Sequence, residues 1–256
     1  MSGKDHTPYV DTKVEAGIAT ITFFHPSHNA LPGNLLERLV VALDQVAADT
    51  AVRVVILKSG GDRTFCAGAS FDELLAIRDK DQGKRFFMGF ASVINAMRRC
   101  PKLIIVRVQG KAVGGGVGIA AAADYCLATR YAAVRLSELA IGIGPFVIEP
   151  AVRRKIGLAA MAELTVSTNW RDAEWAAQKG LYAQVLEDQE KLDLEVDALA
   201  RRLSSFHPAA LEEMKAVFWK DTEDWDRILP ARAATSGRLV LSAFTRKALE
   251  EFKGRA

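Results

Sequence analysis

The sequence predicts an α/β fold in which a mostly parallel sheet is followed by a helical C-terminal part. Strand-like apolar runs alternate with helix-like segments up to about Gly180, a pattern typical of βαβ units. Beyond that point strand-like runs nearly stop and amphipathic segments follow one another. With 256 residues, 50% of them hydrophobic and 25% charged, the chain can bury one sizeable globular core.

The first third of the chain predicts a hairpin, a helix and a buried strand. Tyr9–Val14 and Ile18–Phe23 are rich in β-branched and aromatic residues, and the turn Glu15-Ala16-Gly17 lies between them. Leu35–Ala48 repeats apolar residues at helical spacing. Val54–Leu57 is continuously apolar, which indicates a strand buried on both faces.

The rest of the chain continues the alternation and then becomes helical. In the middle we expect a helix at Phe86–Met97, a buried strand at Leu103–Val108, a small-residue helix at Val117–Ala123, and short strands at Tyr125–Ala128 and Ala133–Leu136. After these we expect amphipathic helices at Leu192–Ser204, Pro208–Phe218, Trp225–Arg238 and Ser242–Phe252. We therefore divide the chain into an α/β core, residues 1–190, and a helical C-terminal region, residues 191–256.

Composition argues against several classes of protein. The longest stretch without polar side chains, Ala112–Ala123, is too short to span a bilayer, and the first residues lack the apolar core of a signal peptide. The three cysteines are widely spaced and suggest neither a disulfide framework nor a metal site. A net charge of +3 does not suggest nucleic acid. We expect a cytoplasmic protein with no membrane, nucleic-acid or metal partner.

A glycine-rich turn, Val113–Gly118, follows a strand and opens a helix. Glycine lets a ligand approach the backbone N–H groups, and a helix N-terminus favours an anion or a developing oxyanion. The dinucleotide fingerprint does not fit because Ile119 stands where its third glycine should be, and Ala112 replaces the Ser or Thr of a phosphate loop. Taken alone, the glycines could equally serve close helix packing.

A second loop, Phe65–Ser70, offers another backbone N–H at a strand end, near Gly68 and Ala69. Two N–H donors from separate loops are what a tetrahedral or enolate oxygen requires. A Gly-x-Ser-x-Gly nucleophile elbow is missing, and we interpret Cys66 as a small buried hydrophobic residue.

These two loops, together with Ala122-Ala123-Asp124 and the segment from Ser137-Glu138-Leu139 to Gly142-Ile143, resemble the enoyl-CoA hydratase/isomerase (crotonase) family. The motifs recur in the family's order over nearly the whole chain. The resemblance implies a spiral of ββα repeats whose core binds acyl-CoA, and a helical trimerisation region at residues 191–256. It also implies a homotrimer or homohexamer in fatty acid metabolism. The substrate would bring coenzyme A, and no cofactor would be bound permanently.

The resemblance also assigns catalytic roles. Ala69 and Gly115 match the two backbone donors that hold the thioester carbonyl oxygen and stabilise the enolate, each typically worth ~3 kcal/mol. Glu138 matches the second of the family's two acidic positions. A carboxylate that faces an apolar acyl pocket would be desolvated, which raises its pKa toward a useful acid/base range.

The resemblance places coenzyme A along three segments. The loop with His28 and Ala30, and Ala67 of the Phe65–Ser70 loop, would line its pantetheine and adenine side. Phe244 could pack on the nucleotide and Lys247 could meet a phosphate, often from a neighbouring subunit. The alternative for Phe244 is a core position in an ordinary amphipathic helix.

The sequence departs from the hydratase pattern at Gly118, where hydratases of the family carry their first glutamate. A single retained glutamate is the pattern of the family's enoyl-CoA isomerases, and Gly144-Pro145-Phe146 also resembles some of them. Glu149 and Glu73 are possible substitute acids, although Glu149 could simply be a charge at a helix end.

The sequence therefore favours double-bond isomerisation of an enoyl-CoA thioester. Two alternatives stay open. One is hydration of a 2-enoyl-CoA, including a branched, methylglutaconyl-CoA-like one, and the other is coenzyme A thioester binding without catalysis. Residues in the Ile77–Phe90 region are expected to set the size of the acyl pocket.

Overall fold

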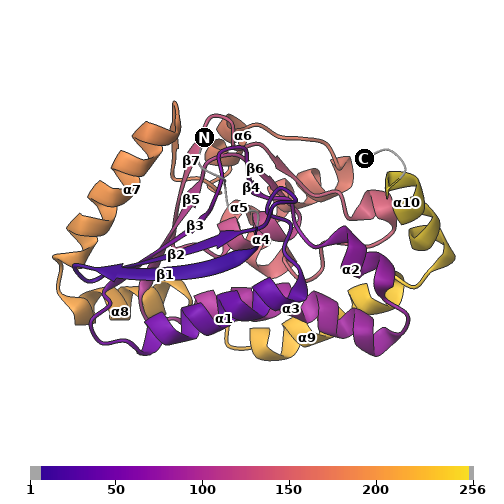
Figure 1. The fold of residues 1–256 in the computed structure, drawn as a ribbon, viewed down its shortest axis with the longest axis horizontal. Helices are drawn as coiled ribbons and strands as arrows, with labels where there is room; N and C mark the ends of the chain where they lie inside the picture. The colour runs from indigo at the N-terminus through magenta and orange to yellow at the C-terminus, as the bar shows by residue number, and fades with distance from the viewer. Residues whose placement is uncertain (1–6, 254–256) are drawn as a thin grey trace.

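The computed structural model describes residues 7–253 and begins with the expected hairpin (Figure 1). Strand β1 (Tyr9–Glu15) pairs antiparallel with β2 (Ile18–Phe24). Both turn residues, Ala16 and Gly17, have positive φ, 49° and 79°. Helix α1 (Gly33–Ala48) follows and buries the apolar face that its spacing predicts.

The chain then repeats a unit of two strands and a helical segment. The first strand of each unit joins a larger sheet and the second joins a smaller one. The units are β3 (Val54–Ser59), β4 (Thr64–Cys66), α2 (Phe71–Ala76) and α3 (Lys80–Arg99); β5 (Leu103–Val108), β6 (Lys111–Val113) and α4 (Gly115–Ala121); and β7 (Tyr125–Thr129), β8 (Val134–Arg135), η1 (Leu139–Ile141) and α5 (Glu149–Ser167). This is the expected spiral of ββα turns.

The larger sheet has the order β1-β2-β3-β5-β7-β9 and the smaller one β4-β6-β8. All pairs except β1–β2 are parallel, as the alternation of elements predicts. Helix α6 (Ala173–Gln178) and strand β9 (Gln184–Leu186) were not expected. Strand β9 is only three residues long and none of them is fully buried, so it lacks the apolar run that marks β3 and β5.

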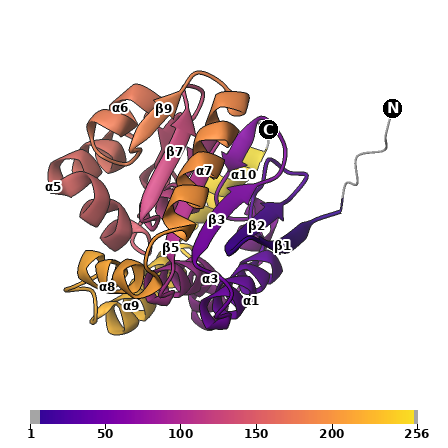
Figure 2. The same cartoon turned by 90° about the vertical axis from the view of Figure 1, so that its left-hand side faces the viewer.

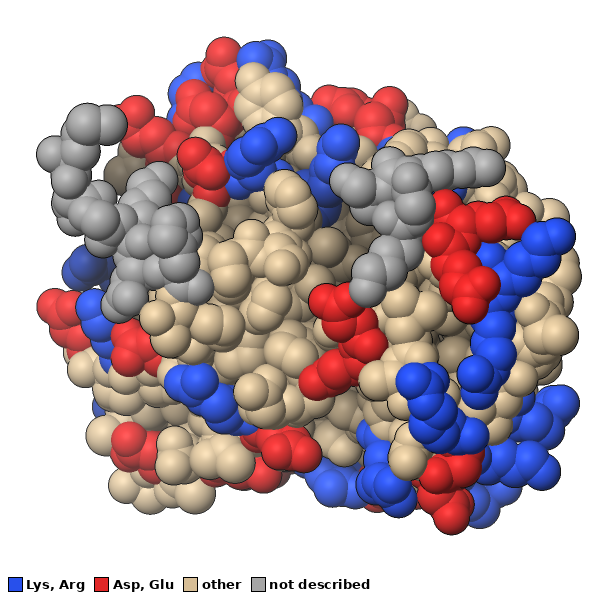
Figure 3. All heavy atoms as spheres, turned by 45° about the vertical axis from the view of Figure 1, so that its right-hand side comes forward, with Lys and Arg blue, Asp and Glu red and all other residues tan. Residues whose placement is uncertain are grey.

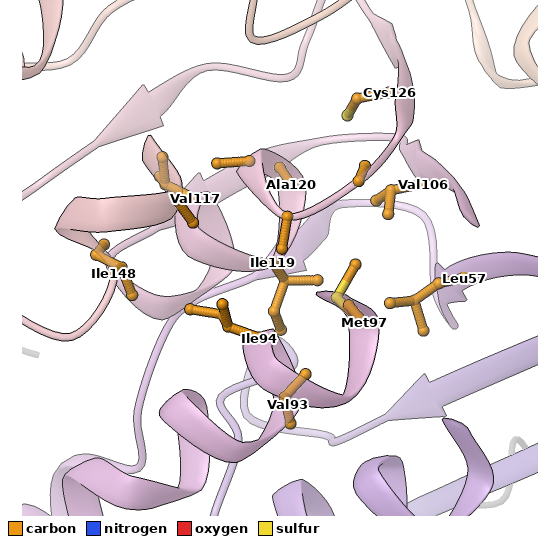
Figure 4. Close-up of a cluster of buried hydrophobic side chains, with 14 of the residues drawn as sticks. Leu57, Val93, Ile94, Met97, Val106, Val117, Ile119, Ala120, Cys126 and Ile148 are labelled. Atoms are coloured by element: carbon orange, nitrogen blue, oxygen red, sulfur yellow. The ribbon is translucent and has the colours of Figure 1, made fainter. Parts of the chain in front are cut away.

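Both faces of the larger sheet are buried, which explains the continuously apolar strands β3 and β5. On one face, Val54, Ile56 and Ile105 pack against α7 (Gln189–Ser204), which Figure 2 shows lying over β3, β5 and β7. On the other face, strand residues join the core formed with α1, α3 and α4 (Figure 4).

The remaining C-terminal helices are α8 (Pro208–Phe218), α9 (Trp225–Leu239) and α10 (Ala243–Lys253), close to the expected bounds. Helix α9 crosses α3 at backbone contact distance. A Cβ at Gly83 would lie 2.6 Å from the carbonyl oxygen of Gly237, so neither position has room for a side chain. Trp225 and Leu229 of α9 share the main core with the α/β part.

A buried ion pair joins Lys215 of α8 to Asp124, which lies between α4 and β7. Asp124 accepts hydrogen bonds from Lys215 Nζ at 2.6 Å and from Trp219 Nε1 at 2.7 Å. The backbone N–H of Ile104 also donates to the Asp124 carboxylate, at 2.7 Å. Because each carboxylate oxygen has a donor, the charge is compensated where water is excluded.

Across residues 7–253, no helix is long and apolar enough to cross a membrane. The same residues contain no group of His, Cys, Asp and Glu side chains that could hold a metal ion. The three cysteines, Cys66, Cys100 and Cys126, are buried and unpaired.

Candidate active site

A largely apolar cavity of about 100 Å³ lies at the start of α4. Its walls come from the loop that precedes α2, from α3, from residues 137–148 and from α9. Most of its lining is apolar or backbone: Ala67, Gly68, Ala69, Phe71, Leu74, Phe87, Phe90, Val113, Gly114, Gly115, Ile141, Ile143, Gly144, Pro145, Phe146, Val147 and Ile148, with Ser137, Glu138 and Ser236 as its polar side chains.

The backbone N–H of Ala69 is left free by the way its loop is held. Leu31 N–H donates to the Gly68 carbonyl at 2.8 Å, and Ser70 N–H donates to the Leu31 carbonyl at 3.3 Å. This is a parallel bridge between Leu31 and Ala69, in which the N–H of Ala69 itself points away from Leu31. No group among the described residues accepts from it.

Gly115 is the first residue of α4, so its N–H has no partner within the helix. Its loop is brought to the Ala69 loop by Gly68, whose φ is +89°. A Cβ on Gly68 would lie 3.0 Å from the Val113 carbonyl oxygen and 3.8 Å from Gly115 N. Both free N–H groups therefore belong to residues that line one cavity.

Each glycine of the turn accommodates a different neighbour. A Cβ at Gly114 would lie 2.8 Å from Glu138 Oε1, and Gly114 also has a φ of +52°. At Gly115 a Cβ would lie 2.1 Å from the Phe90 ring, and at Gly116 it would lie 2.7 Å from Cys66. The alternative of close packing is thus correct for Gly116, whereas Gly114 makes room for a carboxylate.

Glu138 follows the short strand β8 and precedes η1, and its carboxylate lies against the glycine turn. Its Oε2 atom is buried and has no hydrogen-bond partner among the described residues. Burial raises the pKa of Glu138 from its ordinary 4.5 to about 7, and backbone N–H groups of Glu138 and Ser137 partly oppose this. A carboxyl group with such a pKa can take up and release a proton near neutral pH.

The position of the missing first glutamate is filled by apolar side chains. A Cβ at Gly118 would lie 2.5 Å from Ile148 Cγ2 and 3.5 Å from Ile94 Cδ1. Figure 4 shows Ile148 and Ile94 beside helix α4, which carries Val117 and Ile119. No acid could enter at residue 118 without displacing Ile148.

The two candidate substitute acids lie outside the cavity lining. Glu149 is held by Arg232 at 3.2 Å and by Arg153 at 3.6 Å, next to a separate surface cavity. Glu73 accepts a hydrogen bond from the Gly33 N–H at 2.8 Å, at the start of α1. Among the described residues that line this cavity, Glu138 is the one ionisable side chain.

A wider, open cleft adjoins the cavity. Ala67 and Val113 line both, while His28 and Lys111 line the cleft, where the Lys111 ammonium stands 5.1 Å from the centre of the Trp170 ring. The His28 carbonyl accepts from the Ala67 N–H at 3.2 Å. Two of the predicted coenzyme A residues, His28 and Ala67, are therefore brought together.

The other three predicted coenzyme A residues line neither the cavity nor the cleft. Ala30 lies in the loop before α1, and its N–H donates to the Ser27 carbonyl. Phe244 is 65% exposed on α10, beside Gly142, so the alternative of a core position is wrong. Lys247 lies one turn on, 3.9 Å from Glu251. Their roles stay predictions.

The sequence reasoning missed two lining residues that come from distant segments. Ile148 was not connected with Gly118, and Ser236 of α9 was read as part of an ordinary helix. In the Ile77–Phe90 region, which was expected to set the size of the acyl pocket, Phe87 and Phe90 line the cavity, and their role stays a prediction. Cys66 is inert, because burial raises the pKa of its thiol to about 12.

The spiral of ββα units and the cavity at its glycine turn place the protein in the α/β class, with an apolar cavity at the start of α4. Comparison with known sequences gives the family. The family model described as "Enoyl-CoA hydratase/isomerase" matches residues 13–253, and the chain belongs to this family. It is an enzyme of hydratase or isomerase type.

Relatives carry both names. A "Probable enoyl-CoA hydratase" of Bacillus subtilis is 27% identical over 255 residues, covering 96% of this chain and 98% of its own. The mitochondrial methylglutaconyl-CoA hydratase of Mus musculus is 34% identical over 166 residues, covering 64% of this chain and 52% of its own. The peroxisomal Delta(3,5)-Delta(2,4)-dienoyl-CoA isomerase of Arabidopsis thaliana is 28% identical over 214 residues, covering 77% and 76%.

Solved structures share the fold. An enoyl-CoA hydratase from Bacillus halodurans superposes with a TM-score of 0.89 at 21% identity, covering 95% of this chain and 99% of its own. An enoyl-CoA hydratase from Mycobacterium avium gives a TM-score of 0.86 at 28% identity and covers 96% of each chain.

Proposed function

We propose that this enzyme moves the double bond of an enoyl-CoA thioester, with Glu138 as the single proton carrier. The observation that supports this is the composition of the cavity: Glu138 is its one ionisable side chain, and the Gly118 position is filled by Ile148. A hydratase mechanism that holds water between two carboxylates would lack its second acid.

In the proposed reaction the thioester oxygen accepts hydrogen bonds from the N–H groups of Ala69 and Gly115. The Glu138 carboxylate removes a proton from C2 of a 3-enoyl-CoA, and the electron pair of that C–H bond is delocalised onto the thioester oxygen. The same carboxyl group then returns the proton to C4, so that the product is the 2-enoyl isomer and Glu138 is ionised again. The two backbone donors stabilise the dienolate between these steps.

The experiment offers a 3-enoyl-CoA and, separately, a 2-enoyl-CoA to the purified enzyme in deuterated water. Gain of water is detected by mass spectrometry, and the shift of the double bond, which leaves the mass of the thioester unchanged apart from exchanged deuterium, is detected by the ultraviolet absorbance of the conjugated 2-enoyl thioester. We expect conversion of the 3-enoyl to the 2-enoyl compound without gain of water. Glu138→Gln should lose this activity, and Glu149→Gln, which alters an acid outside the cavity, should keep it. A fully active Glu138→Gln variant would refute the proposal.

Hydration of a 2-enoyl-CoA is the second candidate, because two of the relatives are named as hydratases, one of them for methylglutaconyl-CoA. Gain of one water by the 2-enoyl compound would establish it. Coenzyme A thioester binding without turnover of either compound would instead indicate a protein that kept the fold and lost the chemistry.

The proposal includes coenzyme A as part of the substrate, with no cofactor bound permanently. It also includes a homotrimer or homohexamer formed through residues 191–256. Exposed apolar side chains on α8 support contacts between subunits through this region: Met214, Val217 and Phe218. Light scattering of the purified protein tests this. A cytoplasmic location is proposed from the unpaired cysteines, and cell fractionation tests it.

A further inference from the structure

Ser236 is a buried polar residue of the cavity that the proposed reaction does not use. Its exposed fraction is 1%, and its hydroxyl oxygen has no hydrogen-bond partner among the described residues. Removing a hydroxyl from water without giving it a hydrogen bond is unfavourable, so a buried hydroxyl without a partner calls for a functional or structural explanation. Ser236 also lines the same cavity as Glu138.

The Ser236 hydroxyl makes no hydrogen bond to its own helix. A serine or threonine inside a helix commonly donates to the carbonyl one turn earlier. The neighbouring Thr235 does so, to Ala231 at 3.2 Å, whereas Ser236 does not. The helix is also fixed at this level, because the next residue, Gly237, touches the backbone of Gly83 on α3. The residue that carries the unused hydroxyl is therefore fixed in position at the cavity wall.

We propose that Ser236 binds a neutral oxygen, a hydroxyl or a carbonyl, carried by the acyl chain of the substrate. The assignment takes the cavity as the acyl site and in this respect rests on the proposed function. A serine hydroxyl can donate to either group and can also accept from a hydroxyl. Substrates of this class are oxygenated acyl-CoA thioesters rather than plain hydrocarbon ones.

The cavity disfavours a charged group at the same place. None of the described residues that line it is Lys or Arg. Arg232, one turn earlier in α9, is held by Glu149 at 3.2 Å beside another cavity. A carboxylate on the acyl chain would thus lose its hydration without gaining a cation, which is a large cost. Ser236 is accordingly a specificity residue for neutral oxygen.

The test measures binding of saturated thioesters, which have no double bond to move. Butanoyl-, pentanoyl- and hexanoyl-CoA are each compared with the analogue that carries a hydroxyl on its last carbon, by calorimetry. At the chain length that reaches Ser236, the Ser236→Ala variant should bind the hydroxylated ligand about fivefold more weakly than the unchanged enzyme does, the size expected of one hydrogen bond. Binding of the plain ligand should not change.

Two controls separate this role from a structural one. Thr235→Ala removes a neighbouring hydroxyl that already has a partner, and it should leave the preference between the ligands unchanged. Ser236→Ala should unfold at the same temperature as the unchanged enzyme or at a higher one, because it removes a buried hydroxyl that makes no internal hydrogen bond. If Ser236→Ala leaves the preference unaltered at every chain length, the assignment is wrong. Because no turnover is measured, the result stands or falls separately from the isomerase proposal.

Discussion

Replacing Glu138 by Gln should stabilise the protein more at pH 8 than at pH 5, when the variant is compared with the unchanged enzyme at the same pH. The pKa of Glu138 is about 7 in the folded protein and 4.5 is its ordinary value, which we take for the unfolded chain. The folded state therefore holds its proton more tightly. Glu138 does not lower the stability of the fold below about pH 4.5. The cost of ionising it grows as the pH rises and is complete above about pH 7.

The size of the effect follows from the same two values. One pKa unit corresponds to ~1.4 kcal/mol, so the complete penalty for ionising Glu138 in the fold is ~3 kcal/mol. Part of the Glu138 surface is accessible from the cavity, and we therefore expect a measured gain of ~2 kcal/mol for Glu138→Gln between pH 5 and pH 8.

The assay is urea unfolding of both proteins at each pH, followed by circular dichroism. Because the glutamine amide is neutral throughout, any cost of burying it is the same at both pH values and cancels in the difference. Glu149→Gln is the matched control, since its carboxylate is paired with arginines outside the cavity. A free-energy difference that does not change with pH would refute the desolvation of Glu138, and with it the main argument for its role as a base.

Three further predictions follow. The rate of the unchanged enzyme, as kcat/KM, should rise with pH and level off above about pH 7, because only ionised Glu138 can take a proton; a flat profile from pH 5 to pH 9 would contradict this. Gly118→Ala should lose ~1–3 kcal/mol of unfolding free energy, because its Cβ would overlap Ile148; denaturant unfolding measures this, and a variant as stable as the unchanged enzyme would contradict it. Asp124→Ala should cost ~3–5 kcal/mol, because Lys215 would keep a buried charge without its partner; a thermal midpoint near that of the unchanged protein would argue against it.

The sequence predicted the elements whose pattern is local. The hairpin, strands β3 and β5 and helices α7 to α10 follow from periodicity and from a turn, and all were found near their expected bounds. Strand β9 was missed because its three residues have no strand pattern of their own and are extended through their pairing with β7. The two-loop site was expected from motifs, and the free N–H of Ala69 and the placement of Glu138 agree with it.

Contacts between distant segments could not be predicted in this way. That Ile148 fills the space at Gly118 depends on how α5 approaches α4, which no window of sequence contains. The same holds for Ser236, whose helix reaches the cavity only because Gly83 and Gly237 allow two backbones to touch. A glycine in a helix pattern signals a close approach but not its partner.

The filled space at Gly118 bears on the choice between isomerisation and hydration. Had a glutamate simply been lost, the cavity would keep a polar gap in which water could be held. Instead a branched apolar side chain, which also lines the cavity, occupies that space, so the cavity has no second polar group at this place with which to hold an attacking water. Burial raises the pKa of Glu138 to about 7, which makes the carboxylate a stronger base for a C2 proton. Glycine at residue 118, with Ile148 packed against it, thus disfavours water addition, and a single carboxylate at Glu138 favours proton transfer. Together they support the isomerase over the hydratase.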